Sequence, residues 1–300
     1  MALLNFRRHA EPEVADLSGL VGEASIEVMP RTAAKVEDFR SILPRGTRVY
    51  IAHIDGTEFA DMLATARRLA ADGFDVMPHL PARSIPDRAT LADWLARYQG
   101  EAGVRSALVL AGGRADPLGE FASSMQLLET GLFDKFHRIH VAGHPEGNHD
   151  IDPDRTSRIA DEALAWKQRW AEERGILMAI ATQFAFEPQP VTEWIDRLRH
   201  AGIELPVHVG VAGPAKLQTL IKYALACGVG PSLRVLQRRA MDLRKLVLPY
   251  RSDDLLCALQ SWRLQNPKAG LEQIHVFPLG GIIPAAQWLA DLRRGVAAAP

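Results

Sequence analysis

Several residues that could do acid–base chemistry lie within or at the ends of short apolar runs. Glu27 lies in an apolar run that Pro30 ends, and two later runs end at His53 and His79. Burial disfavours the charged form of a carboxyl group and raises its pKa, so Glu27 is a candidate general acid. The structural alternative is a core glutamate that a neighbouring arginine satisfies, and the sequence leaves both open.

Glycines and hydrogen-bonding side chains follow further apolar runs. Gly112 and Gly113 come directly after Ala111. They would let a flat ligand or a phosphate approach the backbone, or they would simply make a tight turn. His144 follows the next run, and Gln183 ends the one after it. So many polar run ends exceed what core packing requires, and together they predict a ligand site.

A segment rich in histidine and aspartate raises a second chemistry, metal-dependent hydrolysis. Its candidate ligands are His137, His140, His144, His149, Asp150, Asp152 and Asp154. His137 and His140 are three residues apart in a predicted strand, so their side chains face opposite sides of it. No His-x-His pair follows the first predicted strand, as it would in the common barrel metallohydrolases. The spacing therefore argues against a metal site.

Composition indicates a globular chain without an excess of either charge. The 300 residues are 47% hydrophobic and 24% charged, and Lys+Arg 35 against Asp+Glu 36 gives a formal net charge of -1. Such a balance does not favour nucleic acid as a partner. Apolar stretches such as Ile176–Ala181 are far shorter than the roughly 18 residues of a membrane span. We expect no membrane partner, and the sequence leaves a homo-oligomer open.

The chain start and the cysteines predict a cytoplasmic protein. Met1–Ala10 has Arg7 and Arg8 after a very short apolar patch, so it lacks the apolar region of a secretory signal. The two cysteines, Cys227 and Cys257, form no metal-binding spacing and no disulfide framework, as is typical of a reducing compartment.

Short runs rich in β-branched residues alternate with segments of helical period, which is typical of βα units around a parallel sheet. The predicted strands are Ser25–Met29, Arg48–His53, Asp75–His79, Ala107–Ala111, Arg138–Ala142, Leu177–Thr182, Val207–Val211 and Gln273–Pro278. The predicted helices between them include Glu58–Ala71, Leu91–Tyr98, Asp154–Arg174, Val191–His200 and Pro214–Cys227.

Eight such strands in a chain of this length predict one α/β domain over residues 1–300, a closed (β/α)8 TIM barrel. The first strand is not followed by the glycine-rich GxGxxG of an open dinucleotide-binding sheet. Leu233–Val247 is predicted to add a helix between strands seven and eight. In such barrels the loops after the strands form one mouth, so the polar run ends should converge there.

The order of these motifs resembles the methylenetetrahydrofolate reductase family. The similarity runs in register from about Ala24 to about Leu279. Ser25–Thr32 is similar to the family's S-F-E-F-F-P-P-R pattern. The other motifs that carry the resemblance are Pro78-His79-Leu80, Ala142-Gly143-His144-Pro145-Glu146 with His149, and Thr182–Glu187.

The resemblance implies FAD at the barrel mouth, NADH or NADPH as electron donor, and reduction of 5,10-methylenetetrahydrofolate to 5-methyltetrahydrofolate. It implies that Glu27 is the general acid that opens the folate ring to an iminium ion, that Gln183 binds the pterin and that Phe184 lies near the ring stack. The residues that it places around the flavin are His53, His79, Ala111, Gly112, Gly113, Ala142, His144, His149, Asp161 and Lys167.

Three positions depart from the family's pattern. Ala111-Gly112-Gly113 replaces an Arg-Gly-Asp motif, His144 replaces a tyrosine that stacks on the flavin, and His53 replaces a hydroxyl residue. Two other functions therefore stay open. One is a metal-dependent barrel hydrolase, and the other is a folate-binding or methyltransfer accessory protein without flavin chemistry.

Overall fold

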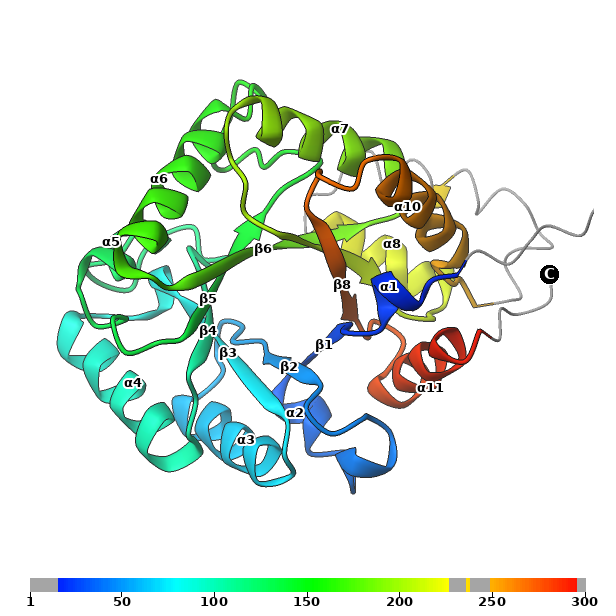
Figure 1. Ribbon diagram of the computed structural model, residues 1–300. Coiled ribbons are helices and arrows are strands. Elements are labelled where there is room, and N and C mark those ends of the chain that lie inside the picture. Colours follow the sequence, from blue (N-terminus) through cyan, green and yellow to red (C-terminus); the bar gives the residue numbers. More distant parts are fainter. Residues whose placement is uncertain (1–15, 227–235, 238–248, 296–300) are drawn as a thin grey trace, which may run out of the picture.

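Eight parallel strands close into a barrel in the computed structural model, which describes residues 16–226, 236–237 and 249–295 (Figure 1). Each strand pairs with the next in chain order, and β8 pairs with β1, so the predicted (β/α)8 barrel is confirmed. The strands are β1 Ser25–Val28, β2 Arg48–Ile51, β3 Asp75–Pro81, β4 Ser106–Leu110, β5 Arg138–Gly143, β6 Leu177–Ala185, β7 Val207–Ala212 and β8 Leu271–Phe277.

Helices surround the barrel on all sides (Figure 1). They are α1 Ser18–Val21, α2 Pro30–Ala33, α3 Phe59–Ala71, α4 Arg88–Ala102, α5 Ser124–Glu129, α6 Arg158–Arg174, α7 Pro188–His200, α8 Leu217–Ala226, α10 Asp253–Gln265 and α11 Ile282–Arg293, with 3-10 turns η1 Phe39–Ser41 and η2 Ala82–Ser84. An extra helix between β7 and β8 is present as α10. The helix predicted at Leu233–Val247 lies outside the described residues, apart from Leu236 and Gln237. Among the described helices, none has the length and apolar character to cross a bilayer.

Aspartate side chains accept hydrogen bonds from free backbone N–H groups in the first turn of two long helices. Asp87 accepts a hydrogen bond from the backbone N–H of Thr90 at the start of α4, at 2.7 Å. Asp152 is 2% exposed and accepts from the N–H groups of Ile159 and Ala160 at the start of α6, at 2.8 and 3.1 Å. Each carboxylate satisfies donors that the helix itself leaves free and complements the positive end of its dipole.

The apolar core lies between the barrel wall and the helices. Strand residues alternate in direction, so Ile26 and Val28 of β1 pack outward in the main core cluster while Ser25 and Glu27 face the opposite side. Inside the barrel the buried residues include Tyr50 of β2 together with histidines of the later strands. The lumen is therefore partly polar: Met77, Leu108 and Ala181 form a small apolar cluster with Tyr50, and the histidines occupy positions where TIM barrels usually pack branched aliphatic side chains.

One irregularity changes which side chains of β6 face inward. Ala181 pairs with His208 of β7, but Phe184 pairs with Gly210, so β6 carries one residue more than β7 between these two pairs. A bulge of this kind reverses the alternation beyond it and aims a side chain at the other face of the sheet. Gly210 is needed opposite the bulge, because a Cβ there would lie 2.4 Å from the carbonyl oxygen of Thr182.

Candidate active site at the carboxyl end of the barrel

A pocket of about 470 Å³ opens at the carboxyl end of β1 and β8, and it is called the mouth pocket below. Its size is within the range of small-molecule sites, and most of its wall is apolar. The lining residues are Glu27, Val28, Met29, Thr32, Lys35, Val36, Ala52, Ile54, Phe184, Tyr223, Phe277, Pro278, Leu279, Gly281, Ile282, Ile283 and Pro284. Among these described residues, Glu27 is the one carboxylate.

Two imidazoles hold the Glu27 carboxylate. Nε2 of His79 on β3 lies 3.3 Å from Glu27 Oε2, and Nε2 of His275 on β8 lies 3.8 Å from the same oxygen. The Glu27 side chain keeps 18% of its surface exposed, whereas His275 is 1% exposed. Strand order explains the arrangement, because β1 pairs with β8 on one side and with β2 on the other.

The pKa of Glu27 is shifted downward, whereas the sequence predicted an upward shift. Burial raises it, but hydrogen bonds and charge from His275 and His79 act against burial and outweigh it, and the pKa falls to about 2. The predicted general acid is thus an ionised carboxylate over the neutral pH range. The sequence argument identified the burial effect correctly, but it did not place His79 and His275 beside Glu27, because they come from strands distant in sequence.

Below Glu27 a column of polar side chains continues along the inside of the barrel. Ser25 Oγ lies 2.9 Å from His275 Nδ1, and the ring of Tyr50 packs on that of His275 with 4.2 Å between the ring centres. Tyr50 is also hydrogen-bonded to His140 of β5, whose ring lies 4.7 Å from that of His208 on β7. Burial lowers the pKa of His140, His208 and His275, so all three are neutral at pH 7.

Phe184 lines the mouth pocket as a result of the bulge in β6. It is 4% exposed and makes edge-to-face contacts with Phe186 and with Phe277 of β8, at 5.7 and 5.6 Å between ring centres. Such contacts fix an aromatic ring against a ligand surface. Of the predicted site residues, Glu27 and Phe184 therefore line the mouth pocket, and His79 contacts Glu27 without lining it.

A second group of predicted residues gathers between β5, β6 and α6. Gln183 is hydrogen-bonded to His144, and the charge of Lys167 acts on the same histidine. Burial lowers the pKa of His144 and lowers that of Lys167 to about 8. Ala142 is half-buried on β5 two residues before His144. None of these four residues lines the mouth pocket.

Other predicted residues lie apart from both groups. Nε2 of His53 is 3.0 Å from the Thr57 carbonyl oxygen, and its ring packs on Trp94 of α4. His149 lines a separate cleft of about 760 Å³ along the start of α7, and Asp161 of α6 binds Arg197 at 3.0 Å.

The glycine segment after β4 forms a turn. Gly112 has φ +93, and a Cβ there would lie 2.9 Å from Cβ of Pro81, so both the turn and the contact with β3 favour glycine. The carbonyl oxygen of Ala111 accepts a hydrogen bond from the N–H of Arg83 at 2.9 Å. Nothing lies within 4 Å of a Cβ at Gly113. The flavin-binding roles of these and the preceding residues stay predictions.

The histidine and aspartate segment does not converge on a metal. The part of the chain that the structure describes has no group of three or more histidine, cysteine, aspartate or glutamate side chains suited to a metal ion. The Asp152 carboxylate accepts a hydrogen bond from the N–H of Ile159 in the first turn of α6, Asp154 accepts one from the Thr156 hydroxyl at 2.9 Å, and His140 lies in the lumen.

Sequence reasoning missed two residues beside the Glu27 carboxylate and in the lumen, His275 and Tyr50. Both lie inside strands rather than at their ends, where polar residues were sought. Tyr50 stands two residues before the end of the apolar run at Ala52, and His275 stands between Ile274 and Val276. The sequence signal that could have identified both residues is a polar side chain that alternates with aliphatic ones along a barrel strand, since such a residue faces the lumen.

Comparison with known proteins overturns the family prediction. No family model matches the chain. One solved structure that resembles it is the catalytic domain of a mannanase from Streptomyces sp. SirexAA-E, with 15% identity over 76% of this chain and 84% of that chain, and a TM-score of 0.40. Because no family model supports them, the predicted membership of the methylenetetrahydrofolate reductase family, the oxidoreductase class and the folate reduction are corrected as wrong.

At this level of identity the likeness concerns the barrel alone, so mannanase activity is not carried over to this chain. The predicted FAD, the nicotinamide donor and the tetrahydrofolate partner came from the family resemblance, and they stay predictions.

Proposed function

We propose that the mouth pocket binds a small, largely apolar organic molecule through a protonated nitrogen, with Glu27 as the counter-ion. The Glu27 carboxylate is the observation that carries this proposal. Its Oε2 lies 3.3 Å from His79 Nε2 and 3.8 Å from His275 Nε2, and the carboxylate itself lines the pocket. A carboxylate within an apolar wall is unfavourable unless a donor or a cation pairs with it. A cationic ligand supplies that partner.

The wall around Glu27 favours an apolar body on the ligand. Phe184, Phe277 and Leu279 line the pocket close to the strand ends, and Ile54 and Ile283 stand at its opening with 54% and 56% of their surface exposed. Aromatic faces also attract a cation. Lys35, the one cationic side chain among the described lining residues, is exposed, so water and salt screen its repulsion.

Glu27 is the charged group that such a ligand would meet. Its pKa of about 2 keeps the carboxylate ionised over the neutral pH range, so it serves as a counter-ion and not as a general acid. His79 stands behind the carboxylate, with Nε2 buried 3.3 Å from Glu27 Oε2, and it does not itself line the mouth pocket. The proposed role of the pocket is therefore recognition of a cationic ligand.

Glycosidic bond hydrolysis is less well supported by this pocket. Most enzymes of that kind use two carboxyl groups about 5 to 9.5 Å apart across the bond. Glu27 has no second carboxylate beside it among the described residues that line the mouth pocket.

Two probes of one shape test the proposal, naphthylmethylamine and naphthylmethanol. Their affinities are measured by calorimetry at pH 7 on the whole protein. We expect the amine to bind at least about tenfold more tightly than the alcohol, because hydrogen bonds to a charged group contribute roughly 1.5–3 kcal/mol. Equal affinities for the two probes would contradict the proposal.

Variants locate the effect. Glu27→Gln keeps the shape of the side chain and removes its charge, so the preference for the amine should disappear while the alcohol still binds. Glu129→Gln, at the exposed end of α5, is the matched control and should leave both affinities unchanged. A preference for the amine that survives in Glu27→Gln would place the counter-ion elsewhere.

A further inference from the structure

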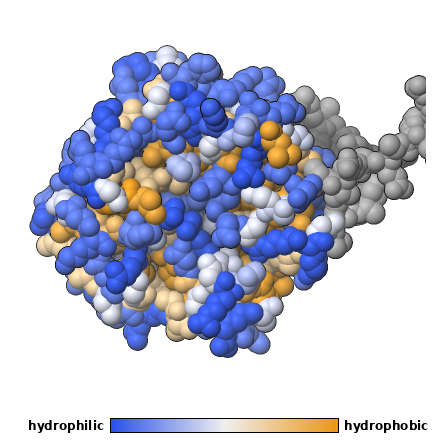
Figure 2. All heavy atoms as spheres, in the orientation of Figure 1, coloured by the Kyte–Doolittle hydropathy of each residue, from blue (hydrophilic) through white to orange (hydrophobic). Residues whose placement is uncertain are grey.

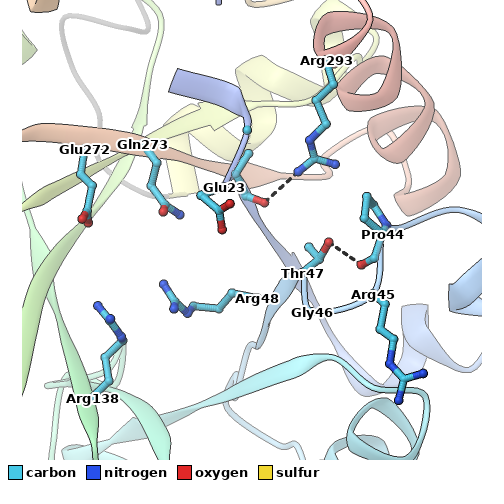
Figure 3. Close-up of a pocket in the computed structure, with 12 residues that line it drawn as sticks. Glu23, Pro44, Arg45, Gly46, Thr47, Arg48, Arg138, Glu272, Gln273 and Arg293 are labelled. Atoms are coloured by element: carbon cyan, nitrogen blue, oxygen red, sulfur yellow. Dashed lines mark hydrogen bonds between the residues drawn. The ribbon is translucent and has the colours of Figure 1, made fainter. Parts of the chain in front are cut away.

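A second pocket lies at the opposite end of the barrel, where the strands begin, and it is called the amino-end pocket below. Its volume is about 440 Å³. Its polar lining residues include Glu23, Arg48, Arg138, Glu272, Gln273 and Arg293 (Figure 3). The face of the protein seen in Figure 2 is largely hydrophilic around its centre. This end of a TIM barrel usually contributes stability rather than binding.

Two arginines face one another in this pocket. Arg48 begins β2 and Arg138 begins β5, and their guanidinium groups point toward each other (Figure 3). Arg48 Nε binds Asp75 at 2.8 Å. Arg138 forms no hydrogen bond or ion pair with any described residue and is half-buried. Guanidinium groups in such an arrangement repel one another unless an anion lies between them.

Two carboxylates near the arginines are already engaged, and a third, Glu23, is an exposed side chain of the pocket wall whose charge acts on Arg293. Asp75 binds Arg48, and Glu272 accepts a hydrogen bond from His208 Nε2 at 2.6 Å. Burial lowers the pKa of Arg138, and the charge of Arg48 lowers it further, while Glu272 and Asp75 oppose both effects without cancelling them. The Arg138 charge is therefore only partly compensated by the protein.

The side-chain amide of Gln273 is a neutral hydrogen-bond donor in the same pocket as Arg48 and Arg138. Gln273 is 5% exposed, lines the pocket beside Glu272, and its Nε2 is buried without a hydrogen-bond partner among the described residues. A buried amide N–H that no group accepts from costs about 1–3 kcal/mol. Figure 3 shows this amide above Arg48, on the side where the two guanidinium groups meet.

We propose that the amino-end pocket binds the phosphate group of a small molecule between Arg48 and Arg138, with the Gln273 amide as a third donor. Guanidinium groups match phosphate oxygens in pairs, and a phosphate offers enough acceptors for two guanidinium groups and an amide at once. The pocket is much larger than one phosphate, so the rest of the molecule would lie toward Thr47 and Arg293.

Calorimetry on the whole protein at pH 7 and low salt tests the proposal with inorganic phosphate and with glycerol phosphate. Saturable binding of either one supports it, and the tighter of the two identifies free phosphate or a phosphate ester as the source. Binding should also raise the melting temperature, because a ligand that binds only the folded state stabilises it. No saturable binding of either compound would overturn the proposal.

Variants separate the pocket from general surface charge. Arg138→Gln should weaken binding by about tenfold or more, since it removes a charged donor. Arg97→Gln, which removes an exposed arginine paired with Glu101 on α4, should leave the affinity unchanged. Equal loss in both variants, or none in Arg138→Gln, would overturn the assignment.

Folding of the variants is followed separately. Arg138→Gln relieves repulsion with Arg48, so without ligand its circular dichroism should match that of the wild type and its melting temperature should be no lower. Arg138→Lys keeps the charge and loses the paired geometry, and it should bind phosphate with intermediate affinity. Binding by Arg138→Lys that equals the wild type would show that charge alone, and not the guanidinium pair, acts there.

Discussion

The Tyr50 hydroxyl on β2 is hydrogen-bonded to Nδ1 of His140 on β5, across the inside of the barrel. Burial raises the pKa of Tyr50, so the hydroxyl keeps its proton at neutral pH. Both residues are fully buried. This bond joins opposite walls of the barrel through side chains, in addition to the backbone ladder that joins neighbouring strands.

We predict that Tyr50→Phe lowers the free energy of unfolding by about 1–3 kcal/mol, because it leaves His140 Nδ1 without its hydrogen-bond partner in a buried site. Nε2 of the same histidine already has no partner among the described residues. Urea unfolding measures the change. Tyr98→Phe is the matched control, since the buried Tyr98 hydroxyl has no described partner, and its removal should be neutral or stabilising.

Stability should fall as the pH drops below the ordinary histidine value of 6.5. Burial holds the pKa of His140, His208 and His275 below that value in the folded state. Below pH 6.5 the unfolded chain therefore binds protons that the folded chain does not, and stability rises with pH in this window. Urea unfolding at several pH values between 8 and 5 measures it. A free energy of unfolding that stays constant over this range would contradict the neutral lumen.

Lys167→Met should stabilise the protein at pH 7 by about 1 kcal/mol or more, because replacing a buried charge by an apolar side chain of similar length removes its desolvation cost. Lys167 is 7% exposed, and burial lowers its pKa to about 8. Lys135→Met, at an exposed position, serves as the control and should change little. A destabilised Lys167→Met variant would mean that the ammonium group has a stabilising partner.

Gly143→Ala should destabilise the barrel by about 1–3 kcal/mol through overpacking. A Cβ at this position would lie 2.4 Å from Ile180 Cγ2 and 2.9 Å from the Trp194 ring. Gly100→Ala in α4 provides the opposite case, because nothing lies within 4 Å of a Cβ there and alanine favours a helix by roughly 0.5–1 kcal/mol. Thermal unfolding of the two variants should therefore shift in opposite directions.

The sequence predicted the barrel and part of the mouth because both depend on local patterns. Eight β-branched runs are readable one at a time, and in a closed barrel their ends must meet, as Glu27 and His79 do. The pKa of Glu27 was not predictable in the same way. It depends on His275, which is 248 positions away in sequence and adjacent only through the pairing of β1 with β8.

The position of Phe184 also needed the structure. It was predicted near a ligand by resemblance, yet strict alternation along β6 would place it on the same side as Ile180, which packs in the outer core. The bulge between Ala181 and Phe184 reverses that direction. No residue pattern in the sequence marks the bulge, because the extra residue is accommodated by Gly210 on the neighbouring strand.

The alternation of the strands gives the barrel wall two independent faces. Outward residues such as Ile26 and Val49 bury apolar surface against the helices, while inward residues such as Tyr50 and His208 contribute hydrogen bonds within the lumen. Hydrophobic stabilisation scales with buried apolar area, so it resides mainly in the outer layer. An engineer could therefore exchange the inner residues as a set, and so install a new ligand specificity, without repacking the layer on which folding depends.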